Sequence, residues 1–188
     1  MLDKQINTSL EVGLAYGCSA AHIMTATKSK HYAIDPYQKS YYHSLGLENI
    51  KKLNLESNLA FENDFSHIVL PRLVQENVRL DFAFIDGGHR FDEIFLDFYY
   101  IDLLLNDQGY VLFHDSWLRA TQLAASWVLK NRAEYHFMGD NENMILFKKG
   151  GIDKRNWMHF KEFYTLKSLI SNRKTIKKLG LDKEGVEK

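Results

Sequence analysis

The sequence has little cysteine, no excess of charge and no long apolar run. Its 188 residues include one cysteine, Cys18, which excludes an internal disulfide framework and is typical of a reducing compartment. Lysine plus arginine equals aspartate plus glutamate, 24 of each, so the net charge indicates neither a nucleic-acid nor a membrane partner. No apolar run reaches the roughly 18 residues that a membrane-spanning helix needs, and the first residues lack the apolar core of a secretion signal. We therefore expect a cytoplasmic protein without nucleic-acid or membrane partners.

Composition and length predict a globular domain followed by a basic extension. Hydrophobic residues make up 45% and charged residues 26% of the chain, which is ordinary for a globular protein. The pair Gly150-Gly151 marks a boundary, so we expect one domain over residues 1–150 and an extension over residues 151–188. Apolar and basic residues beyond the glycines predict a helix over Asp153–Leu179. That helix could dock on its own domain, form a dimer contact or bind an acidic partner.

Strand-like and helix-like segments alternate along the first 150 residues. Apolar runs predict these strands: Ser9–Gly13, His31–Asp35, Leu59–Glu62, Leu80–Asp86 and Tyr110–Asp115. Helical periodicity predicts these helices: Ser19–Ser29, Tyr37–Leu53, Ser66–Asn77, Phe91–Asn106 and Leu118–Asn131. The polar residues 106–109 are interpreted as a helix stop. Alternation of this length predicts a doubly wound α/β domain with right-handed crossovers.

The end of the domain breaks this alternation. Glu134–Gly139 and Asn143–Lys148 read as two strands, and the few residues between them leave no room for a helix. The spacing predicts a hairpin, so the two strands should be antiparallel. The predicted fold class is therefore α/β, a doubly wound, mostly parallel seven-stranded sheet with a C-terminal antiparallel hairpin.

The first predicted strand runs into a glycine turn that is typical of nucleoside-binding units. Gly13 and Gly17 let the backbone bend sharply and approach a ligand closely. The next strand ends in Asp35, about 20 residues after the turn, where a carboxylate can accept hydrogen bonds from two ribose hydroxyls. Cys18 is expected to pack behind the turn as a small apolar group. This unit predicts the binding of an adenosine-containing cofactor.

Polar side chains follow the other predicted strands, at the edge where open α/β sheets bind ligands. They are Asp64, Asp86, His89, His114 and Asp115. If the strands ending at Asp86 and Asp115 are neighbours, two carboxylates and the imidazole of His114 lie together and need a cation or a proton between them. Carboxylates suit Mg²⁺, and a histidine favours Mn²⁺, Fe²⁺ or Zn²⁺. His89 is placed near the same point, as an imidazole suited to general-base catalysis.

Structural interpretations of these residues remain open at this level. Asp86 and Asp115 could each cap the helix that follows, because aspartate caps helices well. His89 could be a hydrogen-bonded loop residue, and His114 a satisfied, half-buried one. The glycine turn with Asp35 could be a purely structural connection between strand and helix.

These residues, in this order, resemble the class I S-adenosylmethionine-dependent methyltransferases. The turn from Glu11 to Gly17 resembles the first motif of that family, and Asp35 resembles its ribose-binding acid. The segments Ile85–His89 and His114-Asp115 are similar to the branch of macrolide-sugar O-methyltransferases and cephalosporin hydroxylase-like proteins. Catechol O-methyltransferases are more distantly similar.

The resemblance implies O-methylation of a small hydroxylated substrate, with S-adenosylmethionine and a divalent cation, Mg²⁺ or Mn²⁺, as cofactors. It assigns cofactor binding to these residues: Glu11, Gly13, Tyr16, Gly17, Ser19, Asp35, Asp64, Phe65 and Asp86. It assigns metal binding to Asp86 and Asp115, with His114 beside them at a position that is often acidic in metal-using members. His89, as base, and Asp86 are the implied catalytic residues.

Two other functions remain open. A nicotinamide-dependent oxidoreductase uses a similar turn and ribose acid, although this turn lacks the usual glycine triplet and the chain has no Tyr-x-x-x-Lys pair. The other is a cofactor-binding subunit without chemistry of its own, which the unusual His114 favours. The segment before the first strand is short, so we expect a partner subunit, in a homodimer, as one way to cover the mouth of the site.

Overall fold

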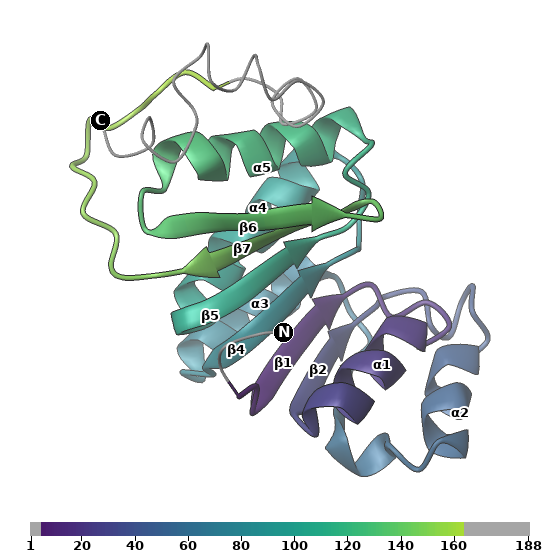
Figure 1. The fold of residues 1–188 in the computed structure, drawn as a ribbon. Coiled ribbons are helices and arrows are strands. Elements are labelled where there is room, and N and C mark those ends of the chain that lie inside the picture. Colours follow the sequence, from purple (N-terminus) through teal and green to yellow (C-terminus); the bar gives the residue numbers. More distant parts are fainter. Residues whose placement is uncertain (1–4, 164–188) are drawn as a thin grey trace.

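The computed structural model describes residues 5–163, in which helices cover both faces of one sheet (Figure 1). Its strands are β1 Thr8–Val12, β2 Lys30–Ile34, β3 Leu59–Glu62, β4 Leu80–Ile85, β5 Leu105–Phe113, β6 Tyr135–Asn141 and β7 Met144–Lys149. They lie in the order β3-β2-β1-β4-β5-β7-β6, and β7 is antiparallel to both of its neighbours. The remaining pairs are parallel. The predicted fold class, including the final hairpin, is confirmed.

The helices divide between the two faces of the sheet. They are α1 Cys18–Thr27, α2 Leu45–Lys52, α3 Ser66–Gln75, α4 Phe91–Leu104 and α5 Arg119–Asn131, with a short 3₁₀ turn at Glu56–Asn58. α1 and α2 lie beside β1 and β2 on one face, and α3, α4 and α5 pack on the other (Figure 1). Within residues 5–163, no helix combines the length and the apolar character needed to cross a bilayer.

The continuous apolar run of β4 follows from its central position. Ala83 and Ile85 belong to the core beneath α3, α4 and α5, whereas Phe82 and Phe84 pack on the opposite face. Because both faces of a central parallel strand are buried, alternation between polar and apolar residues is not needed there. Strand order reverses between β1 and β4, and this switch point is where doubly wound sheets bind ligands.

The helix expected over Tyr37–Leu53 is shorter than the sequence suggested, since α2 begins only at Leu45. Both His43 and Ser44 have left-handed backbones, with φ of 50° and 62°, which interrupt a helix before that residue. The amide of Ser44 bonds to the carbonyl of Gln38, closing an irregular loop. This loop borders the cavity described below.

The helix stop at residues 106–109 was also misplaced. α4 ends at Leu104, and β5 begins at Leu105, which already pairs with Leu80 of β4. The side chain of Asn106 donates to Asp81 of β4 at 3.0 Å, so a residue interpreted as a helix terminator instead ties two strands together. Strand β5 is therefore longer than the predicted Tyr110–Asp115 at its start and ends at Phe113.

The helix expected over Asp153–Leu179 is absent from residues 153–163, and the rest of that range lies outside the described residues. The Asp153 side chain accepts the amide of Arg155 at 3.0 Å, and the Asn156 side chain accepts the amide of Met158 at 2.9 Å. Such local side-chain bonds compete with helical hydrogen bonds for the backbone. The apolar side chain of Trp157, expected on a helix face, is 93% exposed.

Candidate functional site

The turn after β1 touches the end of β4, and only glycine allows the contact. Gly13 has a left-handed φ of 95°, and a Cβ placed there would lie 2.2 Å from the carbonyl oxygen of Asp86. Gly17 has a φ of 78°, and its Cβ would lie 2.8 Å from the carbonyl oxygen of Gly46. Both predicted glycines are thus required by close backbone approaches as well as by conformation.

Asp35 at the end of β2 is almost fully buried and accepts several N–H groups. Its Oδ2 accepts the amides of Leu14 and Ala15, at 3.2 and 2.8 Å, and the side-chain amide of Gln38 at 3.1 Å. Its Oδ1 accepts the amide of Tyr37 at 2.8 Å. The carboxylate therefore holds the glycine turn in place, and Oδ1 keeps an acceptor position for a ligand hydroxyl, because a carboxylate oxygen has two lone pairs.

A cavity of about 500 Å³ opens at the switch point between these elements. Its lining includes Gly13 and Asp35, the aromatic rings of Tyr37, Tyr42 and Phe65, and Asp86 with its following glycines. Tyr37 and Phe65 meet edge to face with ring centroids 6.1 Å apart. The cavity is concave, partly aromatic and carries a few converging polar groups, as ligand sites do.

The structure brings some of the predicted cofactor residues to this cavity and leaves others outside it. Gly13, Asp35, Phe65 and Asp86 belong to its lining. The remaining predicted residues lie outside that lining: Glu11, Tyr16, Gly17, Ser19 and Asp64. Of these, Tyr16 packs its ring against Tyr42, with centroids 5.2 Å apart, and Asp64 accepts the amide of Phe65.

Glu11 is fully buried behind the turn. Ser19, in the first turn of α1, donates its hydroxyl to Oε2 of Glu11 at 2.7 Å. Nε2 of His31 on β2 lies 3.6 Å from Oε1. Glu11 and Ser19 thus join β1 to the start of α1, and their contact with a cofactor stays a prediction.

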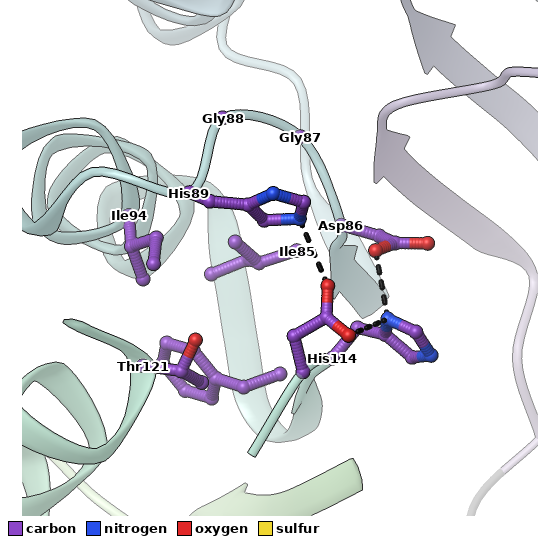
Figure 2. A pocket seen from close by; sticks show the side chains of 10 residues that line it. Ile85, Asp86, Gly87, Gly88, His89, Ile94, His114 and Thr121 are labelled. Atoms are coloured by element: carbon purple, nitrogen blue, oxygen red, sulfur yellow. Dashed lines mark ion pairs between the residues drawn. The ribbon is translucent and has the colours of Figure 1, made fainter. Parts of the chain in front are cut away.

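The strand ends of β4 and β5 bring two carboxylates and an imidazole together (Figure 2). Nδ1 of His114 lies 2.9 Å from Oδ1 of Asp86 and 3.3 Å from Oδ1 of Asp115. One donor atom from each of the three residues lies within 4.8 Å of the others. The predicted neighbourhood of Asp86, His114 and Asp115 is therefore found in the structure.

This cluster fits a divalent cation. Nδ1 of His114 is buried and makes no well-directed hydrogen bond, so its nitrogen is available as a ligand. Two ligands about 2.1 Å from one cation and at right angles lie about 3 Å apart, which is close to the separations within this cluster. An oxygen, oxygen and nitrogen donor set suits Mn²⁺ or Zn²⁺ better than Mg²⁺.

The surroundings of Asp86 and Asp115 shift the pKa values of these two carboxyl groups in opposite directions. Burial raises the pKa of Asp86 to about 6; the neighbouring His114 opposes that rise, and the charge of Asp115 adds to it. Burial also acts to raise the pKa of Asp115, but hydrogen bonds from Trp117 and Asn143 and the nearby His114 outweigh it and hold that pKa below its ordinary value. Asp115 is therefore the firmly ionised member of the pair.

Asp115 also orients His89. Nε2 of His89 lies 2.8 Å from Oδ2 of Asp115, and the other ring nitrogen points away from the cluster (Figure 2). Because an ionised carboxylate only accepts hydrogen bonds, this contact favours the proton on Nε2 and leaves a lone pair on Nδ1. Asp115 thus holds His89 in one tautomer, as a carboxylate does for a histidine that acts as a general base.

Helix capping does not account for either carboxylate. α4 begins after Arg90, whose amide donates to the side chain of Glu93 at 3.2 Å, so the side chain of Asp86 is not its cap. The residue before α5 is Leu118, and that helix has no side-chain cap. The capping interpretation of Asp86 and Asp115 is therefore wrong.

Several residues that support the site could not be predicted from the sequence. Gln38 and Asn143 bond to Asp35 and Asp115 from loops whose positions only the folded chain defines. Cys18, expected to pack behind the turn, is exposed, because it is the first residue of α1 and its side chain faces outward. The separation in sequence between each amide side chain and the aspartate that it contacts differs greatly, so no motif predicts these contacts.

The strand order and the cavity at the switch point define a doubly wound α/β protein with its ligand site at the carboxyl edge. Residues 10–116, more than half of the chain, match the family described as a methyltransferase domain. The chain belongs to that family, which confirms the predicted resemblance. No curated protein sequence matches the chain.

Solved structures share the fold at low sequence identity. The O-methyltransferase TomG from Streptomyces achromogenes, in complex with SAM, has a TM-score of 0.67 at 14% identity, over 78% of this chain and 74% of its own. An O-methyltransferase from Bacillus cereus, in complex with SAH, has a TM-score of 0.64 at 13% identity, over 77% and 74%. MycE from the mycinamycin biosynthetic pathway, in complex with Mg, SAH and mycinamycin VI, has a TM-score of 0.58 at 15% identity, over 90% of this chain and 50% of its own. At such identities the likeness shows the fold alone.

Proposed function

We propose that the protein is an S-adenosylmethionine-dependent O-methyltransferase that acts on a small hydroxylated molecule. One observation carries the proposal: Asp86 lines the cavity at the switch point and also belongs to the cluster with His114 and Asp115. A cofactor in the cavity and an acceptor at the cluster would therefore meet at one residue. Membership of the methyltransferase family supports this reading and gives no support to the oxidoreductase alternative.

The residues around Asp35 are suited to the nucleoside. Oδ1 of Asp35 offers an acceptor to a ribose hydroxyl, and the ring of Phe65, 45% exposed, offers an apolar surface to a base. Glycine at position 13 lets the turn lie against the carbonyl oxygen of Asp86, which a Cβ would approach to 2.2 Å. The carboxylates of Asp35 and Asp86 favour a positively charged ligand such as a sulfonium.

The residues around Asp86 are suited to the acceptor. S-adenosylmethionine supplies the methyl group: a bond forms from acceptor oxygen to methyl carbon as the carbon–sulfur bond breaks, with S-adenosylhomocysteine as the product. His89 would act as the base for the hydroxyl proton, and Asp115, 2.8 Å from its Nε2, would stabilise the imidazolium that results. Asp86, His114 and Asp115 would hold a divalent cation, for which the imidazole favours Mn²⁺ over Mg²⁺, and the cation would lower the pKa of a bound hydroxyl.

Methyl transfer to a panel of catechols, phenols and glycosides, followed with radiolabelled S-adenosylmethionine, tests the proposal. We expect the wild-type protein to label at least one acceptor and His89→Ala to do so about 10²–10⁴-fold more slowly, since it lacks the base. His22→Ala is the matched control, because His22 is an exposed histidine on α1. Equal rates for His89→Ala and the wild type would contradict the assigned role.

A further inference from the structure

The turn between β6 and β7 reaches across to the loop that carries Asp115. Nδ2 of Asn143 donates to Oδ1 of Asp115 at 3.1 Å. Oδ1 of Asn143 accepts the amide of Trp117 at 3.2 Å and the hydroxyl of Ser116 at 3.4 Å, and its carbonyl accepts the amide of Ser116 at 3.0 Å. One residue of the hairpin thus bonds to three successive residues that follow β5.

Several neighbours hold the side chain of Asp115. Its backbone has a φ of 53°, in the left-handed region that aspartate and asparagine adopt more readily than most residues with a side chain. The indole N–H of Trp117 also donates to Oδ1 of Asp115 at 3.0 Å, so Asp115, Asn143 and Trp117 close a ring of hydrogen bonds. Oδ2 is left to face His89.

We propose that Asn143 is a positioning residue of the active site, whose amide fixes the Asp115 carboxylate between His89 and the cluster with Asp86 and His114. The inference rests on the proposed function, because it concerns the geometry of that site. Asn143 is outside the lining of the cavity, so it acts through Asp115.

The chemistry of the amide suits this position. An asparagine side chain offers donors and an acceptor together, which serves a carboxylate on one side and an N–H on the other. An aspartate would place a second negative charge 3.1 Å from Asp115, and an apolar residue would offer neither bond. Asparagine also tolerates the left-handed φ of 72° that this turn requires.

The positioning role of Asn143 is tested by comparing Mn²⁺ binding to the wild-type protein and to Asn143→Gly, measured by electron paramagnetic resonance. Glycine accepts the left-handed backbone, so the substitution removes the side chain without adding strain. Glu142→Gly is the matched control, since Glu142 precedes it in the same turn, is exposed and has a φ of 43°. We expect about tenfold weaker binding for Asn143→Gly and no change for Glu142→Gly. Wild-type affinity in Asn143→Gly, or equal loss in both variants, would overturn the proposal.

The indole N–H resonance of Trp117 provides a second readout that needs no metal. Trp117→Phe identifies the signal in a ¹H–¹⁵N spectrum. Asn143→Gly is expected to move the proton resonance upfield, toward that of a solvated indole, because Asp115 is no longer held against it. An unchanged resonance would overturn the proposal even if the wild-type protein binds no Mn²⁺. If the wild-type protein binds no Mn²⁺, only the proposed metal binding is contradicted, and the indole resonance still tests the role of Asn143.

Discussion

Asp97 on α4 is a buried carboxyl group whose charge the fold compensates poorly. It is 2% exposed, and among the described residues its Oδ2 has no hydrogen-bond partner. Burial raises its pKa to about 7, although a hydrogen bond with Ser66 opposes the rise. Ser66 begins α3 and lines the cavity, so this carboxyl lies directly behind the ligand site.

The raised pKa predicts a loss of stability as pH rises. In the unfolded chain Asp97 ionises near its ordinary value of 3.8, whereas the folded protein retains the proton until about pH 7. The folded state therefore binds more protons over that range, and the free energy of unfolding falls across it, by at most about 4 kcal/mol.

Urea denaturation of Asp97→Asn between pH 5 and pH 8 measures this effect. We expect the free energy of unfolding of the wild type, relative to Asp97→Asn, to be lower at pH 8 than at pH 5, because the amide cannot ionise. Asp92→Asn, at an exposed position on the same helix, should show no such trend. Parallel pH profiles for the wild type and Asp97→Asn would contradict the prediction.

Residues that follow a strand directly could be predicted from the sequence, and residues that arrive from elsewhere could not. Asp86, His114 and Asp115 end neighbouring parallel strands, so the alignment of strand ends brings them together. Asn143 lies 28 positions beyond Asp115 and meets it only because β7 pairs with β5. No pattern in the sequence identifies that contact.

At the scale of elements, the turn between β1 and α1 is held by its two neighbours. Asp35 bonds to its amides from β2, and the end of β4 packs against Gly13 at a distance that no side chain allows. The turn is therefore preorganised before any ligand arrives, which lowers the entropic cost of binding.

Gly13→Ala is expected to weaken the binding of S-adenosylhomocysteine at least tenfold, roughly 1.4 kcal/mol, because the new Cβ must displace the end of β4. Isothermal titration calorimetry measures the change. Gly139→Ala is the control: its φ of 146° imposes comparable backbone strain, but a Cβ there meets nothing within 4 Å. Equal affinities for the two variants would show that the close approach at Gly13 does not matter.

Elements with strong periodicity were predicted well, and errors fell where side chains bond to the local backbone or to a neighbouring strand. For example, the continuous apolar run of β4 correctly predicted a buried strand. By contrast, Asn106 bonds to Asp81, and Asp153 bonds to the amide of Arg155, in competition with helical hydrogen bonds. The apolar periodicity of a sequence carries no information about such bonds, so the C-terminal end of α4 and the segment after β7 were predicted wrongly.

At the scale of the whole molecule, the two halves of the sheet contribute different parts of the site. β1 and β2 supply the glycine turn and Asp35, whereas β4 and β5 supply the carboxylate–imidazole cluster (Figure 1). The antiparallel hairpin secures the second half through Asn143. The expected homodimer stays a prediction. Sedimentation velocity measures the oligomeric state and tests it.

The most direct test of cofactor binding is calorimetric titration of the wild-type protein with S-adenosylhomocysteine and, separately, with NAD. We expect a dissociation constant in the micromolar range for S-adenosylhomocysteine and no measurable binding of NAD, because the turn lacks the glycine triplet with which dinucleotide-binding proteins approach the pyrophosphate. Equal affinity for both ligands, or binding of neither, would contradict the proposed methyltransferase function.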